Sequence, residues 1–358
     1  MDSVAVEERL ESGEADKPGL RLVVVTQQVD PASPVLGATV AKLRALAARV
    51  DELVVLADSA VEEVLPENSR VRLFRSRTKI GRGARFEAIL AAELARRPRS
   101  AAVLAHMCPI YAVLAAPLAR PLGCRVLLWF THWRASGLLR LAERLSTAVV
   151  SVDRGSFPLP SHKLVPIGHG IDLAEFRCVE RHRDDGIRLL ALGRTSPAKG
   201  LDTVIRALAE APAVTLIVHG PSLTDEERSH RAELDRLVME LGLGDRVILA
   251  DPVPRERVPE LMAGVDALVN NMRAGAPDKV VFEAAATCLP VLASNPVFEG
   301  FLSDELRFPR DDAAALGARI RSLGELDLAA LGRDLREKVV REHSVESWAD
   351  RIVELACR

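Results

Sequence analysis

The segment LLALGRTSPAKGLDTVIRAL, residues 189–208, decides the fold and points to the chemistry of this chain. It begins with the aliphatic residues of a buried strand, turns at Gly193 and continues into an amphipathic helix. Arg194 and Lys199 lie on the turn, beside the expected start of the helix. Free N–H groups and partial positive charge at a helix N-terminus, together with two cationic side chains, suit a phosphate. The alternative is an ordinary strand–helix turn that carries two solvated cations.

Short apolar runs alternate with helical patterns on both sides of this segment. Before it, strands are expected at residues 21–26, 53–56, 71–74, 101–104, 126–130, 148–152 and 163–167, and after it at 214–218, 247–249, 267–269 and 291–293. Helices are expected at 38–49, 201–209, 225–241, 258–262 and 279–287, and only helices from about 313 to 357. Thr224 and Glu227 have the spacing of a capping box. Continuous aliphatic strands separated by helices are typical of parallel sheets covered on both faces.

We therefore predict an α/β protein with two doubly wound, Rossmann-like domains in tandem. A disordered acidic tail is expected at residues 1–18, a first domain at 19–178, a polar linker at 179–186, a second domain at 187–343 and a final helix at 344–358. In this architecture ligands bind at the carboxyl ends of the strands, which here places them between the two sheets.

Composition restricts the function classes. The net charge of −2 excludes a general bias toward polyanions, so no nucleic-acid partner is expected. No apolar run approaches the roughly 20 residues that span a bilayer, and the acidic N-terminus does not resemble a signal peptide, so a cytoplasmic protein is expected. The five cysteines are widely scattered, without CxxC or metal-ligand spacing, which predicts reduced thiols and no metal site; they are Cys108, Cys124, Cys178, Cys288 and Cys357.

Three segments in order along the chain resemble glycosyltransferase family 4. Residues 161–176 (SHKLVPIGHGIDLAEF) resemble its domain-junction segment, and LGRTSPAKG resembles its phosphate loop. DPVPRERVPELMAGVDALVN, followed by VFEAAATCLPVLASN, resembles its donor-nucleotide segment. The resemblance implies a GT-B fold whose last helix crosses back to the first domain. It also implies retaining transfer of a sugar from a nucleotide diphosphate sugar, with the acceptor (a glycolipid, a polysaccharide or a small metabolite) on the first domain.

The resemblance assigns donor roles to the second domain. Arg194 and Lys199, with Gly193 in the same loop, would hold the diphosphate and stabilise the charge that develops on it in the transition state. Glu283 would be the second glutamate of the E-x7-E motif and accept hydrogen bonds from the ribose hydroxyls. The first glutamate would fall at Gly275, so Asp278 is expected to substitute for it, with Lys279 as an additional phosphate contact.

The chain has no Asp-x-Asp, which is consistent with metal independence, and no cofactor is expected beyond the donor substrate. On the first domain, His132 stands where the family places a histidine that faces the reacting sugar. Candidates for the same side of the cleft are His106, His169 and Gly37, the last preceding the first long helix where the family has a glycine-rich turn. The alternative for each histidine is a satisfied structural residue. Gly168-x-Gly170 is not a dinucleotide fingerprint, because no long helix follows it.

Basic residues gather between Arg70 and Arg99, with only Glu87 and Glu93 among them. They form either a solvated basic edge or a patch for anionic lipid head groups, which would give peripheral contact with the inner membrane face.

Three other function classes are alternatives to a glycosyltransferase. A nucleotide-sugar 2-epimerase would need catalytic carboxylates in the first domain, and a pyridoxal-type phosphorylase would be far longer. A non-catalytic GT-B protein that binds a nucleotide sugar or a partner is kept open by Gly275.

Overall fold

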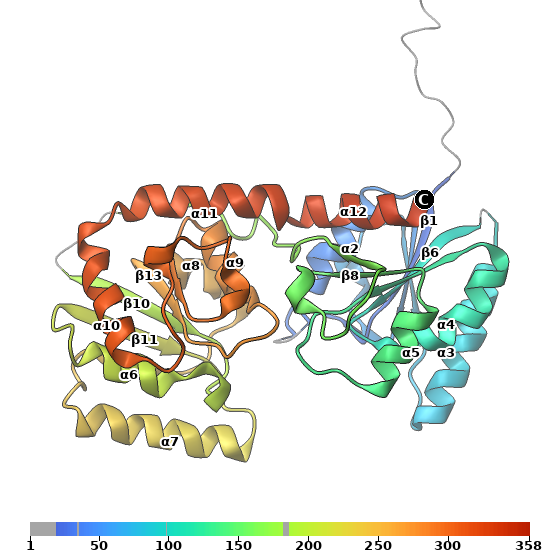
Figure 1. The fold of residues 1–358 in the computed structure, drawn as a ribbon. Coiled ribbons are helices and arrows are strands. Elements are labelled where there is room, and N and C mark those ends of the chain that lie inside the picture. Colours follow the sequence, from blue (N-terminus) through green and yellow to red (C-terminus); the bar gives the residue numbers. More distant parts are fainter. Residues whose placement is uncertain (1–18, 34–35, 98, 182–185) are drawn as a thin grey trace, which may run out of the picture.

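The computed structural model describes residues 19–33, 36–97, 99–181 and 186–358. The tail predicted at 1–18 and residues 182–185 of the predicted linker lie outside the described residues. Two α/β units lie side by side, and α11 (Leu328–Glu342) and α12 (Val345–Cys357) run along one side of both (Figure 1). This arrangement brings the loops of one unit against the loops of the other.

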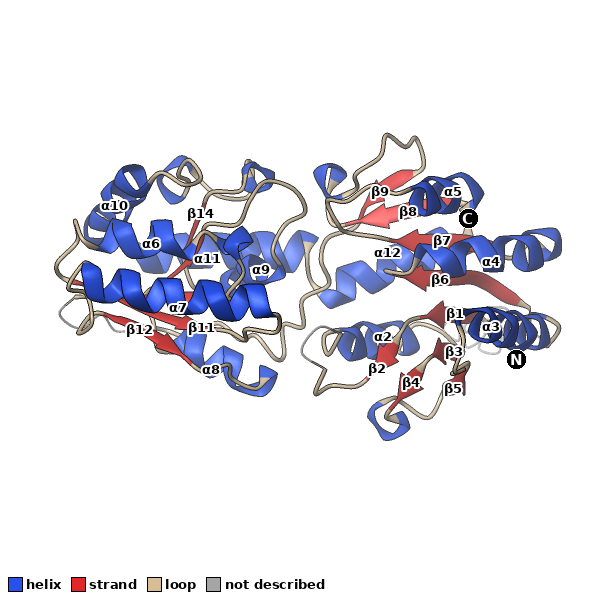
Figure 2. Cartoon of the chain, turned by 90° about the horizontal axis from the view of Figure 1, so that it is seen from below, coloured by secondary structure: helices blue, strands red, loops and turns tan. Residues whose placement is uncertain are grey.

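The first domain is built on a seven-stranded parallel sheet in the order β5-β3-β1-β6-β7-β8-β9 (Figure 2). Its strands are β1 (Arg21–Val25), β3 (Glu52–Ala57), β5 (Ser69–Leu73), β6 (Ser100–His106), β7 (Arg125–Trp129), β8 (Ala148–Ser151) and β9 (Leu164–Pro166). A separate pair joins β2 (Gln28–Val29) and β4 (Ser59–Ala60). One face packs on α3 (Lys79–Leu94), α4 (Pro109–Ala119) and α5 (Gly137–Leu145), and the other on α2 (Thr39–Ala47) and α12.

The second domain has a five-stranded parallel sheet in the order β12-β11-β10-β13-β14. Its strands are β10 (Ile187–Leu192), β11 (Val214–His219), β12 (Val247–Ala250), β13 (Ala267–Asn270) and β14 (Val291–Ala293). Its helices are α6 (Leu201–Leu208), α7 (Asp225–Glu240), α8 (Val258–Ala263), α9 (Lys279–Ala286) and α10 (Ala313–Ser322). The strand order reverses direction after β12, and right-handed crossovers therefore put α6 and α7 on one face and α8 and α9 on the other.

Local sequence explains the boundaries of several elements. The Thr224 hydroxyl accepts the N–H of Glu227, and the Glu227 carboxylate accepts the N–H of Thr224, so the predicted capping box starts α7. Thr78 and Ser136 cap α3 and α5 in the same way. Short 3₁₀ segments fill the connections: Glu62–Val64, Arg120–Leu122, Arg154–Ser156, Pro197–Lys199, Arg255–Arg257, Pro296–Phe298, Asp304–Leu306 and Leu323–Glu325. The predicted α/β architecture with two parallel sheets is confirmed.

The last helix crosses back to the first domain as expected. Trp348 of α12 is buried and packs edge-on against Trp129 of β7, with ring centroids 5.6 Å apart. Arg49 and Asp350 form an ion pair at 2.5 Å beside it. At the first residue of α12, the N–H of Val345 donates to the carbonyl of Ile171, so the two chain crossings between the domains are hydrogen-bonded to each other.

The prediction of reduced thiols is wrong for two of the cysteines. Cys178 and Cys288 are joined by a disulfide that spans 110 residues of sequence. The bond ties the chain just after Phe176 to the turn that follows α9. The spacing of the cysteines in the sequence did not indicate this bond, because only the fold brings Cys178 and Cys288 together. Cys108 and Cys124 are buried free thiols, while Cys357 is free and exposed.

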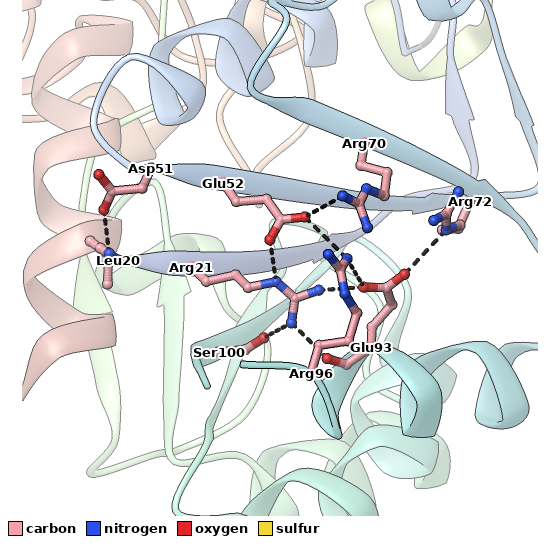
Figure 3. Close-up of polar contacts among 9 residues, drawn as sticks. All are labelled: Leu20, Arg21, Asp51, Glu52, Arg70, Arg72, Glu93, Arg96 and Ser100. Carbon is pink, nitrogen blue, oxygen red and sulfur yellow. Dashed lines mark hydrogen bonds and ion pairs between the residues drawn. The ribbon is translucent and has the colours of Figure 1, made fainter. Parts of the chain in front are cut away.

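Part of the basic stretch forms ion pairs within the first domain. Arg21 is buried at the start of β1, and its guanidinium contacts Glu52 at 2.7 Å, the Ser100 hydroxyl at 3.0 Å and Glu93 (Figure 3). Arg70, Arg72 and Arg96 complete this network by pairing with the same two glutamates. Arg21, Glu52 and Ser100 lie at the first residues of their strands, the sheet edge opposite to the one where ligands bind. The network is therefore structural.

Within the described ranges, no helix combines the length and apolarity needed to cross a membrane.

Candidate functional site

The phosphate loop predicted at residues 193–200 has glycines where side chains would not fit. Gly193 has a φ of 126°, and a Cβ there would lie 2.8 Å from Lys199 Nζ. Gly200 (φ 54°) precedes α6, and its carbonyl accepts a hydrogen bond from the Asn271 amide at 2.9 Å. The strand end, the turn and the helix start are thus fixed as the sequence predicts, with Lys199 folded back over Gly193.

Arg194 leaves this turn toward the N-terminus of α7. Its guanidinium lies 2.7 Å from Glu227 Oε1, while half of the side chain remains exposed. Burial alone would raise the pKa of Glu227, but the hydrogen bond from Arg194 and those from the N–H groups of Leu223 and Thr224 lower it. The capping glutamate therefore stays ionised and orients Arg194, a role that the sequence pattern did not indicate.

Lys199 and Asp278 were predicted as separate contacts, and the structure joins them in an ion pair. Asp278 stands at the N-cap of α9 and also accepts the Asn270 side-chain N–H at 2.9 Å. Burial alone would raise the pKa of Asp278, but the Lys199 charge and these hydrogen bonds lower it. The carboxylate is therefore ionised at neutral pH and holds Lys199 beside the loop.

Glu283 is buried between two cations. Its Oε1 lies 2.8 Å from Lys279 Nζ and 2.9 Å from Arg255 Nη1. Arg255 also contacts Glu175 of the domain junction at 2.9 Å. Burial alone would raise the pKa of Glu283, but the charges of Lys279 and Arg255 lower it overall. Arg255, in the segment DPVPRERV, is a site residue that sequence reasoning missed.

Gly275 explains the departure from the E-x7-E pattern in steric terms. Its φ is 135°, and a Cβ there would lie 2.9 Å from Trp133 Cβ, a residue of the first domain. The Arg273 guanidinium lies 4.1 Å from the centroid of the Trp133 ring. Trp133 thus occupies the space beside position 275 and contacts the donor-side loop across the domain interface. No sequence pattern indicated this contact.

His132 lies beside that contact. Its ring stacks on Trp133 at 5.3 Å between centroids, and its Nδ1 accepts the N–H of Arg134 at 3.0 Å. Burial and the charges of Arg134 and Arg273 lower its pKa. His132 is therefore a neutral imidazole beside the Trp133–Gly275 contact, and its proposed role toward a reacting sugar stays a prediction.

The other candidates of the first domain lie deeper. His106 ends β6 and is buried, as is His169 of the junction. Gly37 precedes α2, and a Cβ there would lie 2.6 Å from the Pro31 carbonyl oxygen and 3.4 Å from Arg255 Cδ. Gly37 therefore lies beside Arg255. Lys42, a buried residue of α2 that sequence reasoning missed, lies near both histidines, because its charge acts on each of them.

A cavity of about 550 Å³ lies between the domains behind α9. It is lined by Phe282, Phe298 and Phe301 of the second domain and by Val152 and Gly168 of the first, and His343 closes it near the chain crossing. None of the predicted site residues lines it. The predicted donor residues instead lie along the carboxyl ends of β10 and β13 and the start of α9.

A family model and solved structures match the chain that carries this candidate site. Residues 174–326 match the family model of glycosyl transferases group 1, a segment that contains the loop, Asp278 and Glu283. The crystal structure of Anabaena HepE in complex with UDP superposes with a TM-score of 0.74 at 18% identity, covering 94% of this chain and 99% of that chain. The fold is therefore GT-B, and these matches support a group 1 glycosyltransferase.

Two curated relatives align with part of this chain. The D-inositol 3-phosphate glycosyltransferase of Mycobacteroides abscessus is 29% identical over 168 residues, or 47% of this chain and 31% of that protein. The GDP-mannose-dependent alpha-(1-6)-phosphatidylinositol monomannoside mannosyltransferase of Mycolicibacterium smegmatis is 29% identical over 219 residues, or 51% of this chain and 55% of that protein. The chain thus aligns with less than two thirds of either relative.

Proposed function

We propose that this chain is a retaining, metal-independent glycosyltransferase that moves a sugar from a nucleotide diphosphate sugar to a hydroxyl of a carbohydrate-type acceptor. The observation that carries the proposal is the pair Arg194 and Lys199 on one glycine turn, within the segment that matches the group 1 model. The structural neighbour in complex with UDP supports a nucleotide donor. The matches do not favour the non-catalytic alternative.

Donor binding is proposed to replace the present carboxylate partners of Arg194 and Lys199 with the diphosphate. Lys199 is held by Asp278 and Arg194 by Glu227, so both cations are oriented while half of Arg194 remains open to solvent. An incoming diphosphate offers each cation a stronger, charge-assisted partner. Glu283 is ionised and can accept hydrogen bonds from the ribose hydroxyls once Lys279 turns toward a phosphate.

Catalysis is proposed to depend on the negative charge that develops on the leaving diphosphate. As the glycosidic C–O bond breaks, its electron pair moves to the leaving diphosphate, and the acceptor hydroxyl transfers its proton to that diphosphate as the new bond forms. Arg194 and Lys199 stabilise the charge on the leaving group more strongly than the charge on the bound donor. Two fixed cations can thus do what a divalent metal does in other transferases.

The acceptor is proposed to be a carbohydrate or an inositol-containing molecule, because the names of both relatives include inositol. Contact with a membrane surface also remains a proposal. Its support is Ile80, which is 87% exposed at the start of α3 between Lys79 and Arg82. Liposome flotation at low salt tests it, and absence of binding to anionic vesicles would contradict it.

The transfer reaction is tested with a panel of nucleotide sugars, in EDTA and with Mg²⁺, using polyols and sugars as acceptors. Product should form equally well in EDTA, and proton NMR should show the anomeric configuration of the donor retained. Arg194→Ala should lower turnover by roughly 10²–10³-fold, the scale of one lost transition-state contact. Arg228→Ala, a nearby exposed arginine paired with Asp225, should not. Full activity in Arg194→Ala would refute the proposed role.

A further inference from the structure

Lys42 is a buried lysine at the domain interface that the donor chemistry does not use. It is 5% exposed, and its ammonium lies 4.4 Å from the centroid of Trp129 and 5.0 Å from that of Trp348. Gly170 makes room for it, because a Cβ there would lie 2.7 Å from Lys42 Cε. The amine is thus enclosed by α2, the end of β7, α12 and the domain junction.

Other nitrogen-bearing groups without hydrogen-bond partners gather around Lys42. His106 lies parallel to Trp129 at 6.4 Å between centroids, and neither of its ring nitrogens has a partner. His169 Nδ1 and the indole Nε1 of Trp348 are also unpartnered. Both histidines and Trp348 are more than nine-tenths buried. Buried polar atoms normally find partners, so this cluster offers unused hydrogen-bonding groups to a ligand.

The cluster lacks a counter-charge. Within the described part of the chain, Lys42 forms no ion pair, and the charge that acts on it from α9 is another cation, Lys279. Burial and Lys279 lower the pKa of Lys42 to about 7, while burial and Lys42 lower the pKa values of His106 and His169. Contact with two tryptophan rings compensates a cation only in part. Strongly perturbed buried groups at an interface are candidates for a binding site.

We propose that Lys42, His106 and His169, with the Trp348 indole, form a subsite for a phosphate monoester carried by the acceptor. The inference rests on the proposed function, because it specifies which acceptors the first domain takes. A phosphate monoester has three acceptor oxygens and close to two negative charges at neutral pH. It can therefore meet an ammonium and several N–H donors at once, which a neutral hydroxyl cannot.

Backbone geometry fixes the two imidazoles. Met107, directly after His106, has a φ of 61°, and its N–H donates to the Trp129 carbonyl at 2.8 Å. Glycines with φ of 77° and 76° flank His169. This left-handed backbone, directly after His106 and on both sides of His169, restricts the directions in which the two side chains can leave the chain.

The test uses the full chain in an Arg194→Ala/Lys199→Met background, which removes phosphate binding by the donor loop. The probes are glycerol 3-phosphate, its neutral counterpart glycerol, and vesicles that contain phosphatidic acid. Binding is followed by thermal unfolding and by the NMR resonances of the histidine rings. Lys163→Met is the matched control, because Lys163 is a lysine of the same domain whose ammonium is held by the carbonyls of Glu143, Arg144 and Ser146.

Glycerol 3-phosphate should raise the melting temperature and shift the His106 and His169 resonances, and glycerol should do neither. Adding Lys42→Met or His106→Gln should weaken this binding by about tenfold or more, while Lys163→Met should not change it. Binding to the vesicles as well would identify a lipid head group as the source of the phosphate. Absence of any shift, or a shift that survives Lys42→Met, would overturn the proposal. Nucleotide binding measured with Lys42→Met alone reports separately on the donor site.

Discussion

Gly275 illustrates how one residue shapes the site. The position lacks the carboxylate of the related motif because its left-handed backbone and the Trp133 side chain leave no space for a Cβ. Gly275→Ala should lower the free energy of unfolding by about 1–3 kcal/mol. The loss should shrink in a Trp133→Ala background, because the steric part then disappears. A double-mutant cycle in urea measures both. Equal losses in the two backgrounds would show that Trp133 does not limit this position.

Lys42 should make stability depend on pH. Its pKa is lowered from 10.5 to about 7 in the folded protein by burial and by Lys279, with His106 and His169 also facing it. Below pH 7 Lys42 is protonated in both the folded and the unfolded chain. The full cost of burying its charge then lowers the free energy of unfolding. Between pH 7 and 10 the unfolded chain binds more protons, and stability rises with pH. Urea unfolding at pH 6 and pH 9 should show a rise of several kcal/mol in the wild type relative to Lys42→Met. Parallel pH profiles would contradict the assignment.

At the scale of elements, the network around Arg21 joins the starts of three strands to the end of α3. Glu93 is 6% exposed there, and burial alone would raise its pKa, but hydrogen bonds from Arg96 and Arg72 lower it overall. Glu93→Gln should lower the free energy of unfolding by about 1–3 kcal/mol, because it removes one of the two carboxylates that pair with the buried Arg21.

The same lowered pKa gives the pH dependence. The contribution of Glu93 is present above the ordinary pKa of a glutamate and is lost as the pH falls through the folded value. Chemical denaturation at pH 7 and pH 3 should therefore show a smaller difference between Glu93→Gln and the wild type at the lower pH. Glu87→Gln on the same helix serves as the control, since Glu87 forms no ion pair within the described residues. Equal stability of Glu93→Gln and the wild type at pH 7 would exclude a stabilising network.

The elements themselves could be predicted because their signals are local. Aliphatic runs gave the strands of both sheets, and the Thr224 capping box gave the start of α7. The loop with Arg194 and Lys199 followed from one strand, a glycine and one helix. Arg255, Trp133, Lys42 and the Cys178–Cys288 bond could not be found in this way. Each acts through a partner far along the chain, and only the packed fold sets that distance.

At the scale of the whole molecule, the disulfide and Arg181 attach the end of the junction to the second domain. The Arg181 guanidinium donates to the carbonyls of Thr287, Cys288 and Met262. We therefore expect domain motion to bend the chain before Cys178, near residues 168–172, and at the crossing before α12.

Removal of the disulfide should be measurable. Cys178→Ala should lower the free energy of unfolding by about 2–5 kcal/mol under non-reducing conditions, because the unfolded chain gains freedom over a long loop. Dithiothreitol should produce the same loss in the wild type and none in the variant. Cys357→Ala, at an exposed free cysteine, is the control. Titration of the unreduced, unfolded protein should find the three free thiols of Cys108, Cys124 and Cys357. Reaction of Cys178 and Cys288 as well would contradict the bond.

The second domain is proposed to hold a nucleotide-sugar site that needs no metal. The most direct measurement is thermal unfolding of the protein in EDTA against a panel of nucleoside diphosphates and nucleotide sugars. One base should raise the melting temperature selectively, and the rise should disappear in Arg194→Ala and Glu283→Ala but persist in Arg228→Ala. A panel in which no nucleotide changes the melting temperature, or in which the rise requires a divalent metal, would contradict the claim.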